Sequence, residues 1–257
     1  MADQASVHWS QADAVARVVI DRPARFNAMT RQMWRDLKRV FSELNCRSDV
    51  RCVVLQGQGD HFCAGGDISE YPMFRHDIEA LRTFHEEEVW GGLQAILDCD
   101  VPVIAAIRGN CMGAGVEMAS CCDLRIATDD ARFGAPIGKL GFPMAPREAL
   151  LVAGALGDGL ARAMLLGAQI LKAERLLGNG FLCQTLEPLS FDDAVDRMTE
   201  QVLSLSTLSA RLNKQTLRAL AAQGLSDAVL DRAYDYAAHD EHREGIAAFL
   251  EKRPPRF

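Results

Sequence analysis

The chain has 257 residues, of which 49% are apolar and 25% are charged, and its net charge at pH 7 is -7. This composition is typical of a globular protein and argues against a disordered chain, and the length allows one large domain or one domain with an appendage. No block of basic residues occurs, so we expect no nucleic-acid partner. No apolar stretch approaches the roughly 18 residues that a membrane-spanning helix needs, so we expect no membrane partner either.

The eight cysteines show no C-x-x-C spacing, which disfavours a zinc ribbon or a thioredoxin-like redox site. The first 20 residues lack the charged and then apolar pattern of a secretory signal. We therefore expect buried thiols in a reducing compartment and a cytoplasmic protein.

The first half of the chain alternates between predicted strands and helices. Apolar, mostly β-branched runs predict strands at 15–20, 50–55, 101–107 and 124–127. Pro23 ends the first of these, because proline cannot continue a central strand. Apolar residues at helical spacing predict helices after a Thr30 N-cap, over 78–97 and over 116–121. This alternation favours parallel βαβ units with right-handed crossovers.

Helical patterns dominate after about residue 145. They cover 147–155, 159–166, 191–204, 208–222 and 226–250, with one late strand expected at 181–185. No internal repeat of 20–50 residues occurs. The pattern predicts an α/β core followed by a helical C-terminal part.

The segment HFCAGGDI, from His61 to Ile68, follows the predicted strand 50–55 after a glycine-rich turn. Its small residues let the backbone approach a ligand closely, and free N–H groups in such a turn can bind a negative oxygen. A plain tight turn would use the same residues, and for this segment alone that interpretation is favoured.

The segment RGNCMGAGVE, from Arg108 to Glu117, joins a buried strand to a helix through glycines. The first N–H groups of a helix lack partners and lie at the positive end of its dipole, which suits an oxyanion. The third glycine of a dinucleotide fingerprint is missing. Glu117 lies in the first turn, where it either acts in catalysis or merely complements the dipole.

Both segments follow the carboxyl ends of predicted parallel strands, where open α/β sheets bind ligands. Two loops that each offer one backbone N–H could hold a single thioester carbonyl from two sides. The combination is therefore more specific for a binding site than either segment alone.

Five segments of this sequence resemble the crotonase superfamily, the enoyl-CoA hydratase/isomerase family. They are RPARFNAM (22–29), FCAGGDI (62–68), PVIAAIRGNCMGAGVEMASCCDLRIA (102–127), ARFGAP (131–136) and EGIAAFLEKRPPRF (244–257). The similarity runs from about Val15 to the C-terminus, in the order and at the spacing of the family. It implies an α/β fold, a crotonase-like spiral of ββα units over 1–195, with a helical C-terminal trimerisation region over 196–257. It also implies a homotrimer or a dimer of trimers.

The resemblance further implies an acyl-CoA thioester as substrate. The oxyanion hole of the family maps to the N–H groups of Gly66 and Ala114, and the first catalytic glutamate maps to Glu117. Glycine is more common where this chain has Ala114, but the N–H group survives that change. No metal or redox cofactor is implied, since coenzyme A enters as part of the substrate.

The sequence departs from the family at Ile137. The second catalytic glutamate of the family usually follows the F-G-x-P motif directly, and isoleucine cannot transfer a proton. Three reactions remain open: hydration with a water or another side chain as the second acid, a double-bond shift by Glu117 alone, and decarboxylation or C–C cleavage. We expect an enoyl-CoA hydratase/isomerase. A non-catalytic acyl-CoA-binding protein is the alternative from another class.

Further residues match positions that contact coenzyme A or the acyl group in the family: Ala24, Arg25, Ala64, Asp67, Ile68, Gly113, Ile137, Phe249 and Lys252. Arg25 is near a common phosphate-binding lysine, and Ser69 stands where another lysine is frequent. Phe249 and Lys252 match a pair that packs on and charge-pairs with the nucleotide. A solvated helix end would equally explain Lys252.

Several polar or aromatic residues are weaker candidates. His239 and His242 could bind a metal, but their spacing is not H-E-x-x-H, and a solvated face is favoured. His85 precedes three glutamates, which predicts an exposed charged helix face. Tyr234 and Tyr236 could reach a substrate tail, although core packing is the favoured interpretation.

Glu148 follows Ile137 by eleven residues and could point at the substrate, but a place at a helix N-terminus explains it more simply. Cys63 and Cys111 flank the two loops. No histidine lies nearby in sequence to activate them, so we expect packing thiols.

Overall fold

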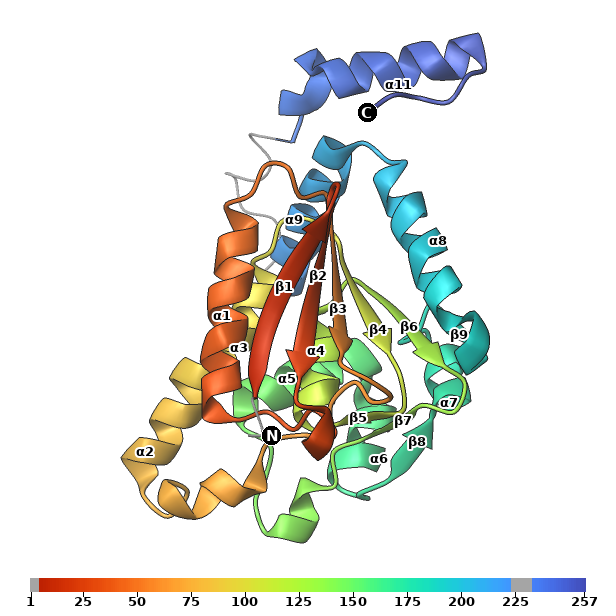
Figure 1. Cartoon of the computed structure of the whole chain (residues 1–257). Helices are drawn as coiled ribbons and strands as arrows, with labels where there is room; N and C mark the ends of the chain where they lie inside the picture. Colours follow the sequence, from red (N-terminus) through yellow and green to blue (C-terminus); the bar gives the residue numbers. More distant parts are fainter. Residues whose placement is uncertain (1–4, 223–232) are drawn as a thin grey trace.

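A computed structural model describes residues 5–222 and 233–257 of the chain. A six-stranded sheet with the strand order β1-β2-β3-β4-β6-β9 forms its centre (Figure 1). The strands are β1 (Ser6–Ala12), β2 (Val15–Asp21), β3 (Cys52–Gly57), β4 (Val103–Ile107), β6 (Leu124–Thr128) and β9 (Gln184–Leu186). Strands β1 and β2 are antiparallel, and all other neighbours are parallel, which confirms the predicted parallel core.

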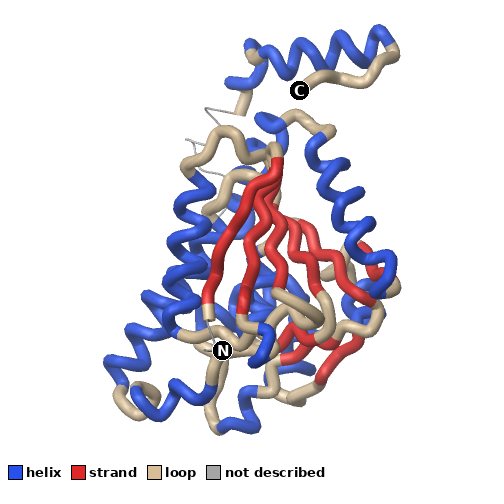
Figure 2. Tube along the Cα trace, viewed as in Figure 1, coloured by secondary structure: helices blue, strands red, loops and turns tan. Residues whose placement is uncertain are grey.

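A second, three-stranded sheet lies below the carboxyl ends of the parallel strands (Figure 2). Its strands are β5 (Asn110–Met112), β7 (Arg132–Gly134) and β8 (Ile170–Lys172). Strand β5 pairs with β7 in parallel, and β7 with β8 antiparallel. Segments this short carry no usable alternation, which is why the sequence did not predict them.

Helices surround both sheets. They are α1 (Arg31–Asn45), α2 (Ile78–Thr83), α3 (Trp90–Leu97), α4 (Ala114–Cys121), α5 (Pro146–Leu156), α6 (Asp158–Leu165), α7 (Ala173–Gly178), α8 (Phe191–Leu203), α9 (Thr207–Ala222) and α11 (Asp240–Glu251). None of the helices that the structure describes is both long and apolar enough to cross a bilayer.

Strands β3 and β4 are apolar on both faces because each face is covered. In β3, Val53 and Leu55 join the large core that includes α1 and α3. Cys52 and Val54 point the other way, to a smaller core that α8 completes. The predicted boundary at 195/196 falls inside α8, and the division into a core and a trimerisation region stays a prediction.

Helix α1 begins where its sequence predicts. The Thr30 hydroxyl accepts a hydrogen bond from the Met33 N–H over 3.1 Å, which satisfies one of the free donors of the first turn. Its buried residues recur at helical spacing: Met33, Trp34, Leu37, Val40, Phe41 and Leu44.

The predicted helix over 78–97 is continuous but not uniform. Between α2 and α3 it becomes a π-helix over Phe84–Val89. The wider turn rotates the side chains out of the α-helical pattern, and such turns are frequent at functional sites.

The predicted helix over 226–250 falls partly outside the described residues. Within them it is confirmed over 240–250 by α11, and it is wrong before that, because His239 is extended and separates a 3-10 turn, Asp235–Ala238, from α11. The prediction that the cysteines are buried is wrong for Cys46 and Cys183, which are exposed, and all eight are free.

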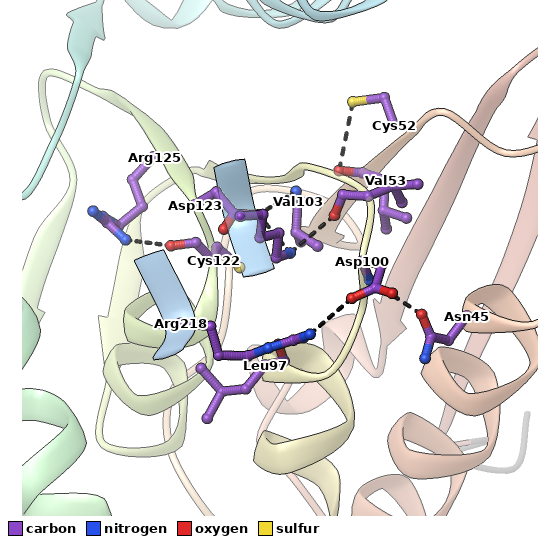
Figure 3. A network of polar contacts seen from close by, with 12 residues as sticks. Asn45, Cys52, Val53, Leu97, Asp100, Val103, Cys122, Asp123, Arg125 and Arg218 are labelled. Carbon is purple, nitrogen blue, oxygen red and sulfur yellow. Dashed lines mark hydrogen bonds and ion pairs between the residues drawn. The ribbon is translucent and has the colours of Figure 1, made fainter. Parts of the chain in front are cut away.

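Ion pairs hold helix α9 against the amino ends of the parallel strands (Figure 3). Arg218 donates to Asp100 over 2.8 Å and to the carbonyl of Leu97 over 2.9 Å. Lys214 donates to Asp123 over 2.7 Å, and the same carboxylate accepts from the Val103 N–H. Helix α9 therefore lies at the end of the main sheet opposite to the small sheet.

Candidate active site

A cavity of about 450 Å³ opens where the two predicted loops meet. Seven of the predicted site residues line it: Ala64, Gly66, Ile68, Gly113, Ala114, Glu117 and Ile137. The structure thus brings together residues that lie up to 73 positions apart in the sequence (137 − 64).

The two loops are held edge to edge by backbone hydrogen bonds. Cys63 and Cys111 pair in parallel as an isolated bridge. The Cys63 N–H donates to Asn110 over 2.9 Å, and the Met112 N–H donates to Cys63 over 2.8 Å. Next to this bridge the backbones nearly touch, since a side chain at Gly113 would lie 3.7 Å from the Gly65 Cα. Gly113 has a φ of +47°, which favours glycine.

Two backbone N–H groups at this junction lack an acceptor among the residues that the structure describes. The pairing of Met29 with the first loop uses the Gly65 carbonyl and the Asp67 N–H, and leaves the Gly66 N–H without a partner. Ala114 is the first residue of α4, so no preceding turn supplies a carbonyl for its N–H. Both residues line the cavity.

The side chain of Asn27 stabilises the first loop through hydrogen bonds. It is fully buried, with a φ of +60°. Its side-chain amide donates to the carbonyls of Gln58, over 3.0 Å, and His61, over 2.6 Å, and its oxygen accepts from the Arg22 N–H over 2.9 Å. The RPARFNAM turn is therefore tied to the loop by satisfied polar contacts.

Asp67 has a structural place beside this turn and does not line the cavity. It forms an ion pair with Arg22 over 2.7 Å and accepts hydrogen bonds from the backbone and hydroxyl of Ser69. Although desolvation opposes the change, these contacts lower the pKa of Asp67. Asp67, which was predicted to contact coenzyme A, therefore lies outside the cavity that the structure shows.

Glu117 lies in the first turn of α4 and is only 7% exposed. Its carboxylate makes no hydrogen bond to the part of the chain that the structure describes. Burial and, secondarily, the negative charge of Glu148 raise the pKa of Glu117 well above its ordinary value. A perturbed, unpaired carboxylate in a cavity is typical of a catalytic group.

A second buried carboxylate, Glu148, lines the same cavity from the first turn of α5. It is 3% exposed, and its Oε1 lies 2.9 Å from Nδ1 of His85 in the π-helix. The expected place at a helix N-terminus is confirmed, and the side chain also faces the cavity, which from the sequence is the less simple explanation. His85 also lines the cavity with an 18% exposed side chain, so its expected exposed position is wrong.

Glu88 shows how a structural carboxylate is buried in this fold. It accepts two hydrogen bonds from Arg31, over 2.8 and 2.7 Å, and one from Arg35 over 2.8 Å. The predicted exposed face of three glutamates is therefore wrong for Glu88. Its charge is compensated, whereas the charge of an ionised Glu117 would not be.

Aromatic residues form much of the remaining wall. Tyr71, Phe84 and Phe142 line the cavity, and the Arg75 guanidinium lies 3.5 Å from the Phe142 ring centre and 4.6 Å from that of Tyr71. Burial is the main cause that raises the pKa of Tyr71 to about 12. These residues were missed in the sequence because they lie outside any motif.

Besides Asp67, four predicted substrate contacts do not reach this cavity in one chain. Ala24 and Arg25 are exposed in the short 3-10 turn Pro23–Arg25 and do not line it. Phe249, 82% exposed, and Lys252 lie at the end of α11, which Figure 1 shows at the opposite end of the main sheet. The chain alone therefore does not bring these four residues together with the loops.

The weaker candidates have local roles. His239 caps α11 by accepting from the Glu241 N–H, and His242 packs edge-on against Tyr236 at 5.1 Å. No group of three or more His, Cys, Asp or Glu side chains is arranged for a metal ion within the described ranges. Tyr234 is exposed, so the favoured core position is wrong for it.

Cys63 and Cys111 are fully buried, and desolvation raises the pKa of both thiols, that of Cys63 to about 12. A buried neutral thiol is a poor nucleophile. The prediction that they pack between the loops agrees with this placement.

Comparisons of this chain with known proteins all point to one family. The model of the family "Enoyl-CoA hydratase/isomerase" matches residues 10–257. A crotonyl-CoA hydratase of Syntrophomonas wolfei is 29% identical over 259 residues, which cover 95% of this chain and 95% of that protein. A short-chain-enoyl-CoA hydratase of Clostridium acetobutylicum is 29% identical over 245 residues, covering 93% and 92%. The crystal structure of an enoyl-CoA hydratase/carnithine racemase from Magnetospirillum magneticum matches with a TM-score of 0.94 at 30% identity, and covers 98% of this chain and 94% of its own.

The close contact between the loops generates a stability prediction. A methyl group at Gly115 would lie 2.9 Å from the Cys63 carbonyl oxygen and 3.1 Å from its Cβ. We expect Gly115→Ala to lower the free energy of unfolding by about 1–3 kcal/mol, because overpacking forces the loops apart. Urea denaturation measures this change.

Gly154→Ala is the matched control. Gly154 lies inside α5 with nothing within 4 Å of the added methyl group, so the same substitution should raise stability by about 0.5–1 kcal/mol through helix propensity. Equal effects of the two substitutions would contradict the close packing of α4 on the first loop.

Proposed function

The chain belongs to the enoyl-CoA hydratase/isomerase family, the crotonase superfamily, and from that premise we propose that it is an enzyme that adds water to an enoyl-CoA thioester or shifts its double bond. The observation that carries this proposal is the convergence on one cavity of the buried carboxyl group of Glu117 and two backbone N–H groups that lack acceptors among the described residues. Coenzyme A is the carrier of the acyl group and no separate cofactor is proposed.

In this mechanism the thioester oxygen binds between the N–H groups of Gly66 and Ala114. Reaction at the α- or β-carbon turns the carbonyl into an enolate and places negative charge on that oxygen. Donors that are already oriented act most strongly where charge develops, and the loss of one typically costs about 3–4 kcal/mol of transition-state stabilisation. The cavity supplies these donors from the backbone, so the side chain at position 114 need not be glycine.

Glu117 acts as the acid/base group. It is buried beside the Ala114 N–H, in the first turn of the same helix. Hydration is the reaction named for the relatives in Syntrophomonas and Clostridium, which supports it over isomerisation. Ile137 lines the cavity where the family usually has its second glutamate, so decarboxylation and C–C cleavage are the alternatives that need only the oxyanion hole.

We also propose a homotrimer or dimer of trimers, in which a neighbouring copy brings Phe249 and Lys252 toward coenzyme A bound near Ala24 and Arg25. Support comes from α11, a C-terminal helix on which Ile246, Phe249 and Leu250 are exposed. Exposed apolar patches of this kind mark association surfaces. The cytoplasmic location stays a prediction.

The enzymatic proposal predicts turnover of crotonyl-CoA, measured by the loss of absorbance of its conjugated thioester. Glu117→Gln should lower the rate by about 10²–10⁴, the usual contribution of an acid/base group. A 3-enoyl-CoA, assayed in parallel, distinguishes the double-bond shift from hydration. If the wild-type protein binds coenzyme A esters but is as inert as Glu117→Gln on both, hydration and the double-bond shift are contradicted, and the C–C-cleaving and non-catalytic alternatives are left.

The oxyanion hole can be tested by removing a single N–H group. Proline fits the first position of a helix, so Ala114→Pro should fold normally while the donor disappears. We expect kcat to fall by about 10²–10³, with little change in the unfolding temperature. Ala114→Gly keeps the N–H and serves as the control. A fully active Ala114→Pro protein would show that this N–H does not bind the thioester oxygen.

The proposed assembly predicts a molar mass in light scattering of three or six times 28.2 kDa. Replacing Phe249 and Leu250 together by serine should lower this mass, because the apolar contact is lost. Leu189, which is 98% exposed at a distance from α11 in sequence, offers a control as Leu189→Ser. A monomeric wild-type protein would contradict the assembly.

A further inference from the structure

Adding water to a double bond requires two proton transfers at different atoms. The attacking water loses a proton as its oxygen bonds to the β-carbon, and the α-carbon gains one. Where the family usually has its second carboxylate, Ile137 presents a hydrocarbon side chain to the cavity. If the proposed hydration takes place, the second proton-transfer group must come from elsewhere in the cavity wall.

We propose that Glu148, held by His85, is this second group: it accepts the proton of the attacking water, and Glu117 delivers the proton to the α-carbon. This inference rests on the proposed function and assigns a residue and a direction of proton transfer to it. Glu148 is the catalytic base in this scheme, and His85 is a positioning residue.

The placement of Glu148 supports the assignment. It lines the same cavity as Glu117 but comes from another helix, α5 rather than α4. Both carboxyl groups are buried, and they are close enough for the charge of Glu148 to act on Glu117. Glu148 therefore reaches the interior of the site, although its position in the sequence is eleven residues beyond Ile137.

The two carboxyl groups have different surroundings, which assigns their roles. Oε1 of Glu148 lies 2.9 Å from Nδ1 of His85, and in the proposed scheme the carboxylate accepts a hydrogen bond from that ring nitrogen. Within the described residues this is the one hydrogen bond of the Glu148 carboxylate. Glu117 has no donor there, and its burial favours the protonated form. Carboxyl pairs whose environments differ in this way divide into an acid and a base.

Other charged groups face the pair from the surrounding elements. Arg75 and the hydroxyl of Tyr71 both interact electrostatically with Glu148, and Tyr71 keeps its proton because its pKa is raised to about 12. Lys139 lines the cavity on the side of Ile137. Outside, Arg147 pairs with Glu86 over 3.1 Å between the same two elements, α5 and the π-helix.

The proposed step is balanced. The water O–H bond breaks and its proton passes to the Glu148 carboxylate, while the water oxygen forms a bond to the β-carbon. The electron pair of the double bond moves to the enolate, whose oxygen is held by the two N–H groups. The α-carbon then takes the proton of Glu117. One proton is accepted and one is delivered, and exchange with solvent returns both groups to their starting forms.

A purely structural role for the pair would give a different result. The hydrogen bond also joins α5 to the π-helix, so its loss could only loosen the wall of the cavity. Exchange of α-protons separates the two roles, because it needs the oxyanion hole and Glu117 but no attacking water.

The experiment compares Glu148→Gln with wild type in two assays: hydration of crotonyl-CoA, and α-proton exchange of butyryl-CoA in D₂O. We expect hydration to fall by about 10²–10⁴ while exchange is retained. Glu117→Gln should lose both activities. Glu87→Gln, an exposed position in the same π-helix as His85, is the matched control and should behave as wild type.

His85→Phe provides an independent readout. The substitution removes the contact that orients Glu148, so kcat for hydration should fall while α-proton exchange is retained. A structural role alone predicts a lower unfolding temperature and an equal loss of both activities. This variant keeps the proposal testable if Glu148→Gln does not fold.

Three outcomes overturn the inference. If wild type and Glu148→Gln hydrate equally well, Glu148 is not the base, and the proposed function stands without it. A folded Glu148→Gln protein that loses exchange as well as hydration would show that Glu148 supports the whole site rather than the water. If wild type exchanges α-protons but hydrates no enoyl-CoA, the hydratase assignment itself fails, and the role of Glu148 as base fails with it.

Discussion

The hydrogen-bonded contact between Cys63 and Cys111 joins two loops that are almost fifty residues apart in sequence, and the geometry of the site follows from it. Each loop leaves a strand of the main sheet at its carboxyl end, and the pairing leaves one N–H of each loop without an acceptor in residues 5–222 and 233–257. Small residues are required at this junction, since even a methyl group at Gly115 would collide with the neighbouring loop. Because small residues form the junction of the two loops, space for a ligand remains beside it.

A second constraint is how far hydrogen-bond donors compensate the charge of each buried carboxylate. Glu88 is surrounded by arginine donors, as expected of a carboxylate that only stabilises the fold. Glu117 has no donor among the described residues and Glu148 has His85 alone. Burying carboxyl groups with so few partners lowers stability, and proteins tolerate this cost mostly at functional sites. The contrast within one chain separates structural from catalytic carboxylates more sharply than burial alone does.

The two ends of the main sheet carry different structural features. The carboxyl ends of the strands carry the cavity and the small sheet (Figure 2). The amino ends carry the ion pairs of Arg218 and Lys214 that hold α9 (Figure 3), and α11 lies beyond them. In the proposed assembly, the C-terminal helices can therefore mediate association without disturbing the loops that surround the thioester.

The sequence by itself determined the central strands and α1 with its Thr30 cap, because these features depend on local periodicity. Its motifs also identified the family, and the resemblance to that family implied the roles of Gly66, Ala114 and Glu117, which line the cavity. Strands β5, β7 and β8 were beyond its reach, since three-residue strands form only where neighbours supply their hydrogen bonds. Only the tertiary structure decided that Glu148 and His85 meet inside the cavity. Their contact spans 63 residues and depends on a π-helical turn, for which no local pattern exists.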